Sequence, residues 1–140
     1  MAKKASIPMV HGPLLHSSGE IVYVDLENSI NGIKGVVGGY AERVVLRDGA
    51  DLFFNDDRRL GLPPNLVGRA FANLYSERPF NRDIVGSVLI LGRGTVDGDS
   101  ADAPEWIESV ALSNDGKAAV REQINRIRDD RSGHGTTSNI

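Results

Sequence analysis

Five consecutive polar residues, Asn55 to Arg59, are the part of this sequence whose types and spacing best suit chemistry. Asn55, Asp56 and Asp57 carry amide and carboxylate oxygens, which are the ligands that Mg²⁺ and Ca²⁺ prefer. Asp and Asn also occupy turns because their side chains bond to the neighbouring backbone, and the adjacent Arg58 and Arg59 would compete for the carboxylates. We therefore expect a structural loop, with Asp56 and Asp57 as weak candidates for a metal site and with no cofactor.

Arginines form a second candidate site around a rigid turn. The segment 61–65 contains two successive prolines, and Pro64 is placed to open a helix. A helix N-terminus offers free N–H groups and a favourable dipole to an anion, and guanidinium groups match phosphate geometry. The residues expected to contact such a ligand are Asn55, Arg58, Arg59, Asn65 and Arg69, with Arg78 and Arg82 as further arginines nearby.

Most other catalytic patterns are missing from the sequence. It has no cysteine, which removes disulfides, thiolate metal sites and cysteine nucleophiles together. His11, His16 and His134 have no metal-ligand spacing. The Gly92-Arg93-Gly94 sequence lacks the third glycine of a dinucleotide fingerprint, and no Gly-x-Ser-x-Gly elbow occurs. The sequence therefore leans against an enzyme.

Composition narrows the class of partner. The chain has 140 residues, of which 40% are hydrophobic and 25% charged, as is typical of one globular domain. A net charge of −3 makes nonspecific nucleic-acid binding an unlikely function, because that function needs a basic face. No apolar run approaches the ~20 residues that cross a bilayer, and no secretory signal follows Met1. We expect a cytoplasmic protein without membrane contact.

The elements that must position these residues alternate between strands and helices. The Asp48-Gly49 pair is a strong hairpin signal, and Gly38 or Gly39 is a natural helix stop. We predict strands at 21–24, 40–47, 51–54 and 84–91, and helices at 27–37, from Pro64 onward, at 104–112 and at 117–128. The only tryptophan, Trp106, is expected to anchor the C-terminal helices to the core.

These elements predict an α+β fold. It has a mainly antiparallel sheet of four or five strands, with two helices on one face and a C-terminal helical appendage. The predicted organisation is an N-terminal arm or edge strand (1–19), a core domain (20–95), a helical extension (96–128) and a disordered tail (129–140). The tail assignment rests on its charged, then Gly/Ser/Thr-rich composition.

The central block resembles an uncharacterised family, a domain of unknown function found mainly in bacteriophages, plasmids and their hosts. The resemblance covers roughly residues 20–92, leaves out Trp106, and departs at Arg58, where a glycine is expected. It implies a small accessory role in a mobile element and supplies no catalytic residues. The residues that carry it are Val37-Gly38-Gly39-Tyr40 with Glu42, Asn55-Asp56-Asp57, Leu60-Gly61-Leu62-Pro63-Pro64-Asn65, and Ile84-Val85-Gly86 with Leu89 and Leu91-Gly92.

Three functions remain open at the level of sequence. The leading one is a non-enzymatic phage or plasmid accessory protein that binds a host protein or a small anionic, nucleotide-like ligand, with counter-defence as one such role. The second is a small metal-dependent hydrolase that uses the loop Asn55-Asp56-Asp57. The third is a structural, self-assembling module, so the oligomeric state stays open.

Overall fold

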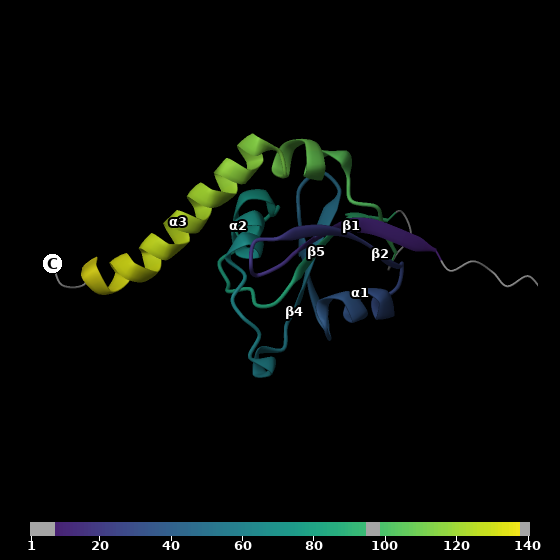
Figure 1. The fold of residues 1–140 in the computed structure, drawn as a ribbon, viewed down its shortest axis with the longest axis horizontal. Coiled ribbons are helices and arrows are strands. Elements are labelled where there is room, and N and C mark those ends of the chain that lie inside the picture. The colour runs from purple at the N-terminus through teal and green to yellow at the C-terminus, as the bar shows by residue number, and fades with distance from the viewer. Residues whose placement is uncertain (1–7, 95–98, 138–140) are drawn as a thin grey trace, which may run out of the picture.

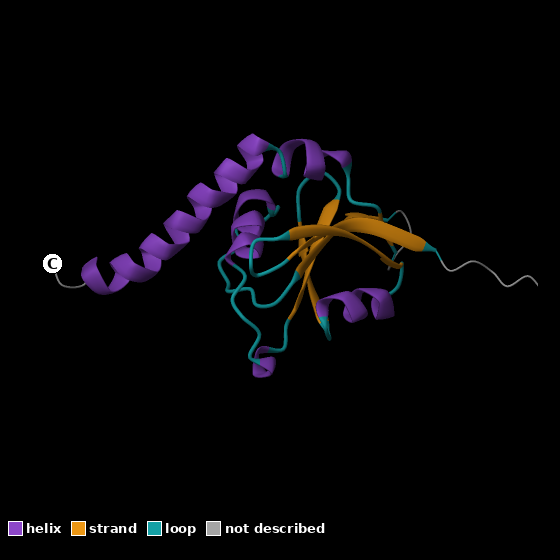
Figure 2. Ribbon diagram, viewed as in Figure 1, coloured by secondary structure: helices purple, strands orange, loops and turns teal. Residues whose placement is uncertain are grey.

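The computed structural model describes residues 8–94 and 99–137. Its centre is a six-stranded antiparallel sheet with helices on both faces (Figure 1 and Figure 2). The strands are β1 (Met9–Leu15), β2 (Ile21–Glu27), β3 (Ala41–Val45), β4 (Ala50–Asn55), β5 (Val88–Arg93) and β6 (Ser100–Ala101). The helices are α1 (Ile30–Val37), α2 (Leu66–Tyr75) and α3 (Asn114–Thr137), with a 3-10 turn η1 (Arg58–Leu60) and a π-helix η2 (Ile107–Ala111). The predicted α+β class and antiparallel sheet are confirmed.

The strand order is β2-β1-β5-β4-β3, and β6 pairs with the far end of β5. Strand β1 therefore lies inside the sheet, where the sequence suggested an arm or an edge strand. Gly12 and Pro13 favoured an edge position. In the structure Gly12 is required by the close approach of β5, because a Cβ atom at this position would collide with the carbonyl oxygen of Ile90. Residues 1–7 of the predicted arm lie outside the described residues.

The two faces of the sheet carry separate hydrophobic clusters. Phe53 faces α1, whose Ile33 and Val37 pack in the same cluster. Phe54, the next residue along β4, faces α2, η2 and α3 in the larger cluster. Successive side chains of a strand point to opposite faces, so a run of apolar residues in β4 serves both layers. The prediction that α1 and α2 share one face is corrected, since they cover opposite faces (Figure 1).

Local signals set the ends of the first helix and the hairpin as the sequence indicated. Ser29 caps α1, because its Oγ accepts a hydrogen bond from the Gly32 N–H at 3.0 Å. Gly38 ends α1 with a φ of 88°, a left-handed conformation that glycine adopts readily. Asp48 and Gly49 both have positive φ, 52° and 80°, and they lie in the three-residue connection between Leu46 and Ala50, where the Leu46 N–H donates to the Ala50 carbonyl at 2.9 Å.

The C-terminal part packs on the α2 side of the sheet. Trp106 packs against the larger cluster, lies 5.4 Å from the Tyr75 ring, and donates from Nε1 to the Asp48 carbonyl at 3.0 Å. It therefore anchors the C-terminal helices to the core, as predicted. Helix α3 lies against α2 and continues over residues 129–137, where the sequence suggested disorder (Figure 1). Residues 138–140 lie outside the described residues.

Candidate functional site

The loop after β4 is organised by hydrogen bonds within itself. Asn55 is buried, its Nδ2 donates to the Val37 carbonyl at 3.2 Å, and its Oδ1 accepts from the Asp57 N–H at 2.7 Å. Arg59 donates to the Asp57 carboxylate from its backbone N–H (3.0 Å), Nε (3.0 Å) and Nη2 (3.1 Å). These hydrogen bonds hold the pKa of Asp57 below its usual range. Asn55 and Asp57 thus join α1, β4 and η1.

The same contacts bear on the metal hypothesis. Arg59 occupies both oxygens of the Asp57 carboxylate, and Asp56 is exposed. Among the described residues, no group of three or more His, Asp or Glu side chains is placed to hold a metal ion. Arg58 begins η1, and its side chain lies outside the described part of the structure.

Asn65 is fully buried, and its side chain forms hydrogen bonds to three separate segments of the chain. Its Nδ2 donates to the carbonyls of Leu15 (2.9 Å) and Gly86 (2.7 Å). Its Oδ1 accepts from the Gly68 N–H at 2.8 Å, which makes it the N-cap of α2. Both of its N–H donors are therefore used inside the protein.

The predicted arginine site is dispersed. Arg59 pairs with Asp57, and Arg69 pairs with Asp83 at 2.8 Å. Arg82 forms a two-point ion pair with Glu42, which raises the pKa of Arg82. Arg78 and Arg82 line a hollow beside β3 that contains neither Arg59 nor Arg69. The structure pairs Arg59, Arg69 and Arg82 with three separate carboxylates, and ligand binding by the predicted residues stays a prediction.

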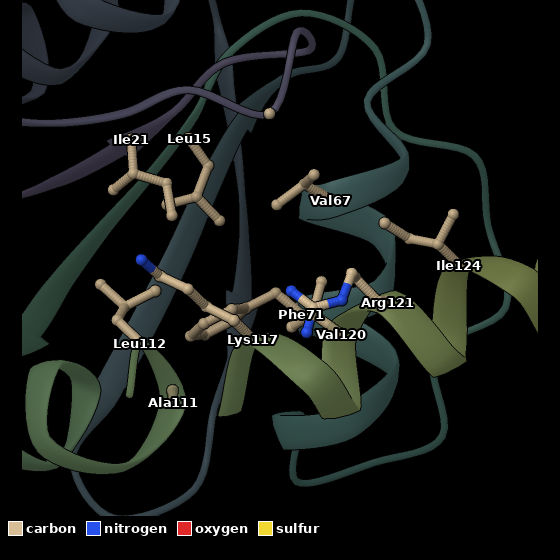
Figure 3. Close-up of a pocket in the computed structure, with 11 residues that line it drawn as sticks. Leu15, Ile21, Val67, Phe71, Ala111, Leu112, Lys117, Val120, Arg121 and Ile124 are labelled. Carbon is tan, nitrogen blue, oxygen red and sulfur yellow. The ribbon is translucent and has the colours of Figure 1, made fainter. Parts of the chain in front are cut away.

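An apolar groove lies elsewhere, along the side of α3 that faces the β1–β2 turn. We call it the α3 groove. Its volume is about 380 Å³, and its side chains come from β1, β2, α2, η2 and α3 (Figure 3). The lining residues are Leu15, Gly19, Ile21, Val67, Phe71, Ala111, Leu112, Lys117, Val120, Arg121 and Ile124.

The floor and walls of the α3 groove are hydrocarbon. Leu15, Phe71 and Val120 are buried members of the larger cluster and form its floor. Ile21, Val67, Leu112 and Ile124 are half-buried and form its walls. Figure 3 shows Leu15, Ile21 and Val67 on one side of the open space and the α3 side chains on the other. The groove therefore presents apolar surface that no described part of the chain covers.

Three cations follow this groove along α3. Lys117 and Arg121 line it, and their nitrogen atoms extend into the open space (Figure 3). Arg128 lines an adjoining hollow of about 390 Å³ that shares Gly19, Val67 and Ile124 with the first. Neither set of lining residues contains a carboxylate. Within residues 8–94 and 99–137, no ion pair involves Lys117, Arg121 or Arg128.

Sequence reasoning missed this groove. It predicted a helix at 117–128 and placed no candidate site residue on it. The signal was the stripe of Lys117, Arg121, Ile124 and Arg128, whose spacings of four, three and four place them on one helix face. What the spacing could not supply was the opposite wall, which comes from β1, β2 and α2.

A second polar cluster lies at the opposite end of β1. His11 Nδ1 lies 2.6 Å from Asp25 Oδ1, and the His11 ring stacks on Tyr23 at 5.3 Å. Burial and the nearby Glu108 raise the pKa of Tyr23. His11, Tyr23 and Glu108 border a hollow of about 170 Å³. The pair orients an exposed imidazole, and the cluster secures η2 to the sheet.

Comparisons with known proteins give a family and no relative of known activity. A family model described as Domain of unknown function (DUF3846) matches residues 13–114. No curated protein and no solved structure matches the chain. The match extends beyond the 20–92 range of the sequence resemblance and includes Trp106, which the resemblance had left out. No described helix combines the length and hydropathy needed to cross a membrane.

Proposed function

We propose, from the premise that this chain belongs to the DUF3846 family of domains of unknown function, that it is a non-enzymatic binding protein. Its α3 groove takes a ligand that is apolar on one side and anionic on the other. The observation that carries the proposal is an open apolar groove followed by Lys117, Arg121 and Arg128 with no carboxylate in its lining.

The size and chemistry of the groove support this choice. Binding hollows in proteins typically measure about 300–1,000 Å³ and combine apolar walls with a few placed polar groups. The α3 groove, at about 380 Å³, falls in that range. An anion placed against Lys117 and Arg121 would gain charge-assisted contacts, while its hydrocarbon part would remove the exposed walls from water.

The alternatives find less support. A free nucleotide would need an aromatic platform for its base, yet the only aromatic lining residue, Phe71, is fully buried. The hydrolase reading needs the Asp57 carboxylate, which Arg59 occupies. The groove is compatible with the expectation that a phage or plasmid accessory protein binds a host protein. Counter-defence is one role that such binding would serve.

The test uses anilinonaphthalene sulfonate (ANS), a fluorescent probe that is both apolar and anionic. The wild-type chain is expected to bind it with saturable fluorescence enhancement. Arg121→Glu should weaken binding about fivefold, because an exposed ion pair contributes up to about 1 kcal/mol. Val67→Ser should weaken it through loss of apolar wall.

The matched control is Arg126→Glu, on the same helix with the same change of charge but outside both hollows. It should bind ANS within about twofold of the wild type, since among the described residues its only ion pair is the exposed one with Glu122. Circular dichroism of each variant excludes the ANS binding that loosened cores show. Equal loss in Arg121→Glu and Arg126→Glu would overturn the proposal.

A further inference from the structure

We infer that the occupant of the α3 groove is an acidic amphipathic helix of a partner protein, an inference that rests on the proposed function. Three features of the groove lead to it: the spacing of the cations, the shape of the apolar floor and the chemistry of the opposite rim. Each feature narrows the class of ligand beyond the requirement that it be apolar on one side and anionic on the other.

The cations are spread along the groove. Lys117 and Arg128 are 11 positions apart along α3, with Arg121 between them, and at a rise of 1.5 Å per residue this separation is about 16 Å. A single-chain amphiphile carries one anionic head and would meet one end of this row. A ligand that pairs with all three cations needs several negative charges at helical spacing, as Glu residues four and seven positions apart would supply.

The apolar floor has room for more than one anchor. The α3 groove and the adjoining hollow of about 390 Å³ share Gly19, Val67 and Ile124, so they form one continuous depression. Amphipathic helices bind such depressions through apolar side chains at i, i+3 or i+4, and i+7. The groove thus fits the apolar face of a helix of about three turns that lies along α3.

The two rims differ in charge. The α3 rim is basic, whereas the opposite rim consists of Ser17, Ser18 and Gly19 from the β1–β2 turn. The partner helix therefore carries its acidic residues on the flank toward α3 and neutral polar residues on the other flank. This asymmetry fixes the side on which the partner's acids must lie.

Single-stranded nucleic acid also presents regular negative charge, but the groove does not suit it. Nonspecific strand binding relies on exposed aromatic side chains for base stacking. Apart from Gly19, Lys117 and Arg121, the residues that line the α3 groove are aliphatic or are Phe71, which is fully buried. The net charge of −3 also opposes approach of a polyanion.

The experiment uses a labelled peptide of about 18 residues, long enough for about five helical turns. It has Leu at i, i+3, i+4 and i+7 repeats, Glu along one flank and Gln along the other. Fluorescence anisotropy measures its binding to the full chain. A second peptide has the same composition in an order that destroys the amphipathic face.

The designed peptide is expected to bind and to displace ANS, and the reordered peptide to bind at least tenfold more weakly. Arg121→Glu should weaken binding about fivefold and Arg126→Glu less than twofold, with the difference shrinking as salt rises. A Lys-for-Glu version of the peptide should prefer the double variant Lys117→Glu/Arg121→Glu to the wild type, since that swap restores opposite charges.

The outcomes separate this inference from the proposed function. If dodecanoate displaces ANS and neither peptide does, the groove binds amphiphiles and the helix inference is overturned. Equal binding of the two peptides, or displacement of ANS by a single-stranded oligonucleotide alone, also overturns it. If neither ANS nor the designed peptide binds a folded chain, both proposals fail together.

Discussion

The polar side chains between Asn55 and Asn65 resemble the cations of the α3 groove in kind and differ in what surrounds them. Asn55, Asp57, Arg59 and Asn65 have hydrogen-bond partners within the chain. In contrast, Lys117 and Arg121 extend over apolar surface without a carboxylate in the groove lining. The polar groups of the first region pair within the chain, whereas under the proposed function the cations of the second pair with a ligand.

The contrast between the two regions distinguishes two reasons why polar residues lie close together in a protein. A buried amide is retained where backbone groups would otherwise lose their hydrogen bonds. A set of like charges beside apolar surface contributes little to stability, and such arrangements are typical of sites kept for function. Residue type alone pointed to the first region, and the surroundings point to the second.

Asn65→Ala tests the structural half of this comparison most severely. The substitution removes the cap of α2 and leaves the Leu15 and Gly86 carbonyls without their donor in a buried position. We expect a loss of about 3 kcal/mol in the free energy of unfolding. Urea denaturation followed by circular dichroism measures it.

The control for Asn65→Ala is Asn81→Ala, at an exposed position. It should change the free energy of unfolding by less than about 0.5 kcal/mol, as surface substitutions usually do. If Asn65→Ala were equally mild, Asn65 would not be a structural residue, and its earlier assignment as a ligand contact would regain weight.

Asn55→Ala should have a smaller effect of the same sign. It removes the hydrogen bond to the Val37 carbonyl and the one from the Asp57 N–H, and so detaches α1 from the end of β4. We expect a loss of about 1 to 2 kcal/mol, again by urea denaturation. Loss of ANS binding without loss of stability would contradict the comparison, because it would place the ligand at this loop.

Much of the fold could be predicted because its signals are local. Gly38 ends α1, and Asp48-Gly49 turns the hairpin, through backbone preferences that need no distant partner. The inner position of β1 could not be predicted, because Gly12 is explained only by the approach of Ile90 from β5. The opposite placement of α1 and α2 likewise depends on which side of β4 each helix reaches.

The contacts of the candidate site residues could not be predicted, for a related reason. Asn65 was selected for its place beside Pro64, but its three hydrogen bonds go to residues as distant as Leu15. The α3 groove forms only where β1, β2 and α2 pack beside α3. This packing brings together residues that are far apart in the sequence, so no local pattern predicts it. The contact between Asp57 and its competitor Arg59 could be anticipated, since the two residues are only two positions apart.

Lys117→Glu tests the functional half of the comparison by opposite effects on stability and binding. Lys117 lies four residues from Arg121 and near the start of α3, where Ser113 Oγ caps the Gly116 N–H. A negative charge there would relieve like-charge repulsion and suit the helix dipole. We expect a gain of about 0.5 kcal/mol in the free energy of unfolding and weaker ANS binding.

Thermal and urea unfolding measure the first effect of Lys117→Glu, and ANS titration measures the second. Arg126→Lys is the control, because it keeps the charge on α3 and should leave both quantities within error. If Lys117→Glu lowered stability and binding in parallel, Lys117 would belong to the folded framework, and the contrast between the two regions would not hold.

The smallest effect concerns the pH response of the loop after β4. Arg59 lowers the pKa of Asp57, whose ordinary value is 3.8, through hydrogen bonds from its side chain and backbone. A carboxyl whose pKa is lower in the folded state stabilises the fold above its unfolded pKa, and the contribution is lost as pH falls through the folded pKa.

A carbon-detected NMR titration should therefore place the Asp57 midpoint below 3.8 in the wild type. Arg59→Ala should move it upward, whereas Arg78→Ala, at an exposed position outside this loop, should leave it in place. An Asp57 midpoint that does not respond to Arg59→Ala would mean that the loop is less closed by its own contacts than the structure indicates, and the carboxylate would again be open to an external cation.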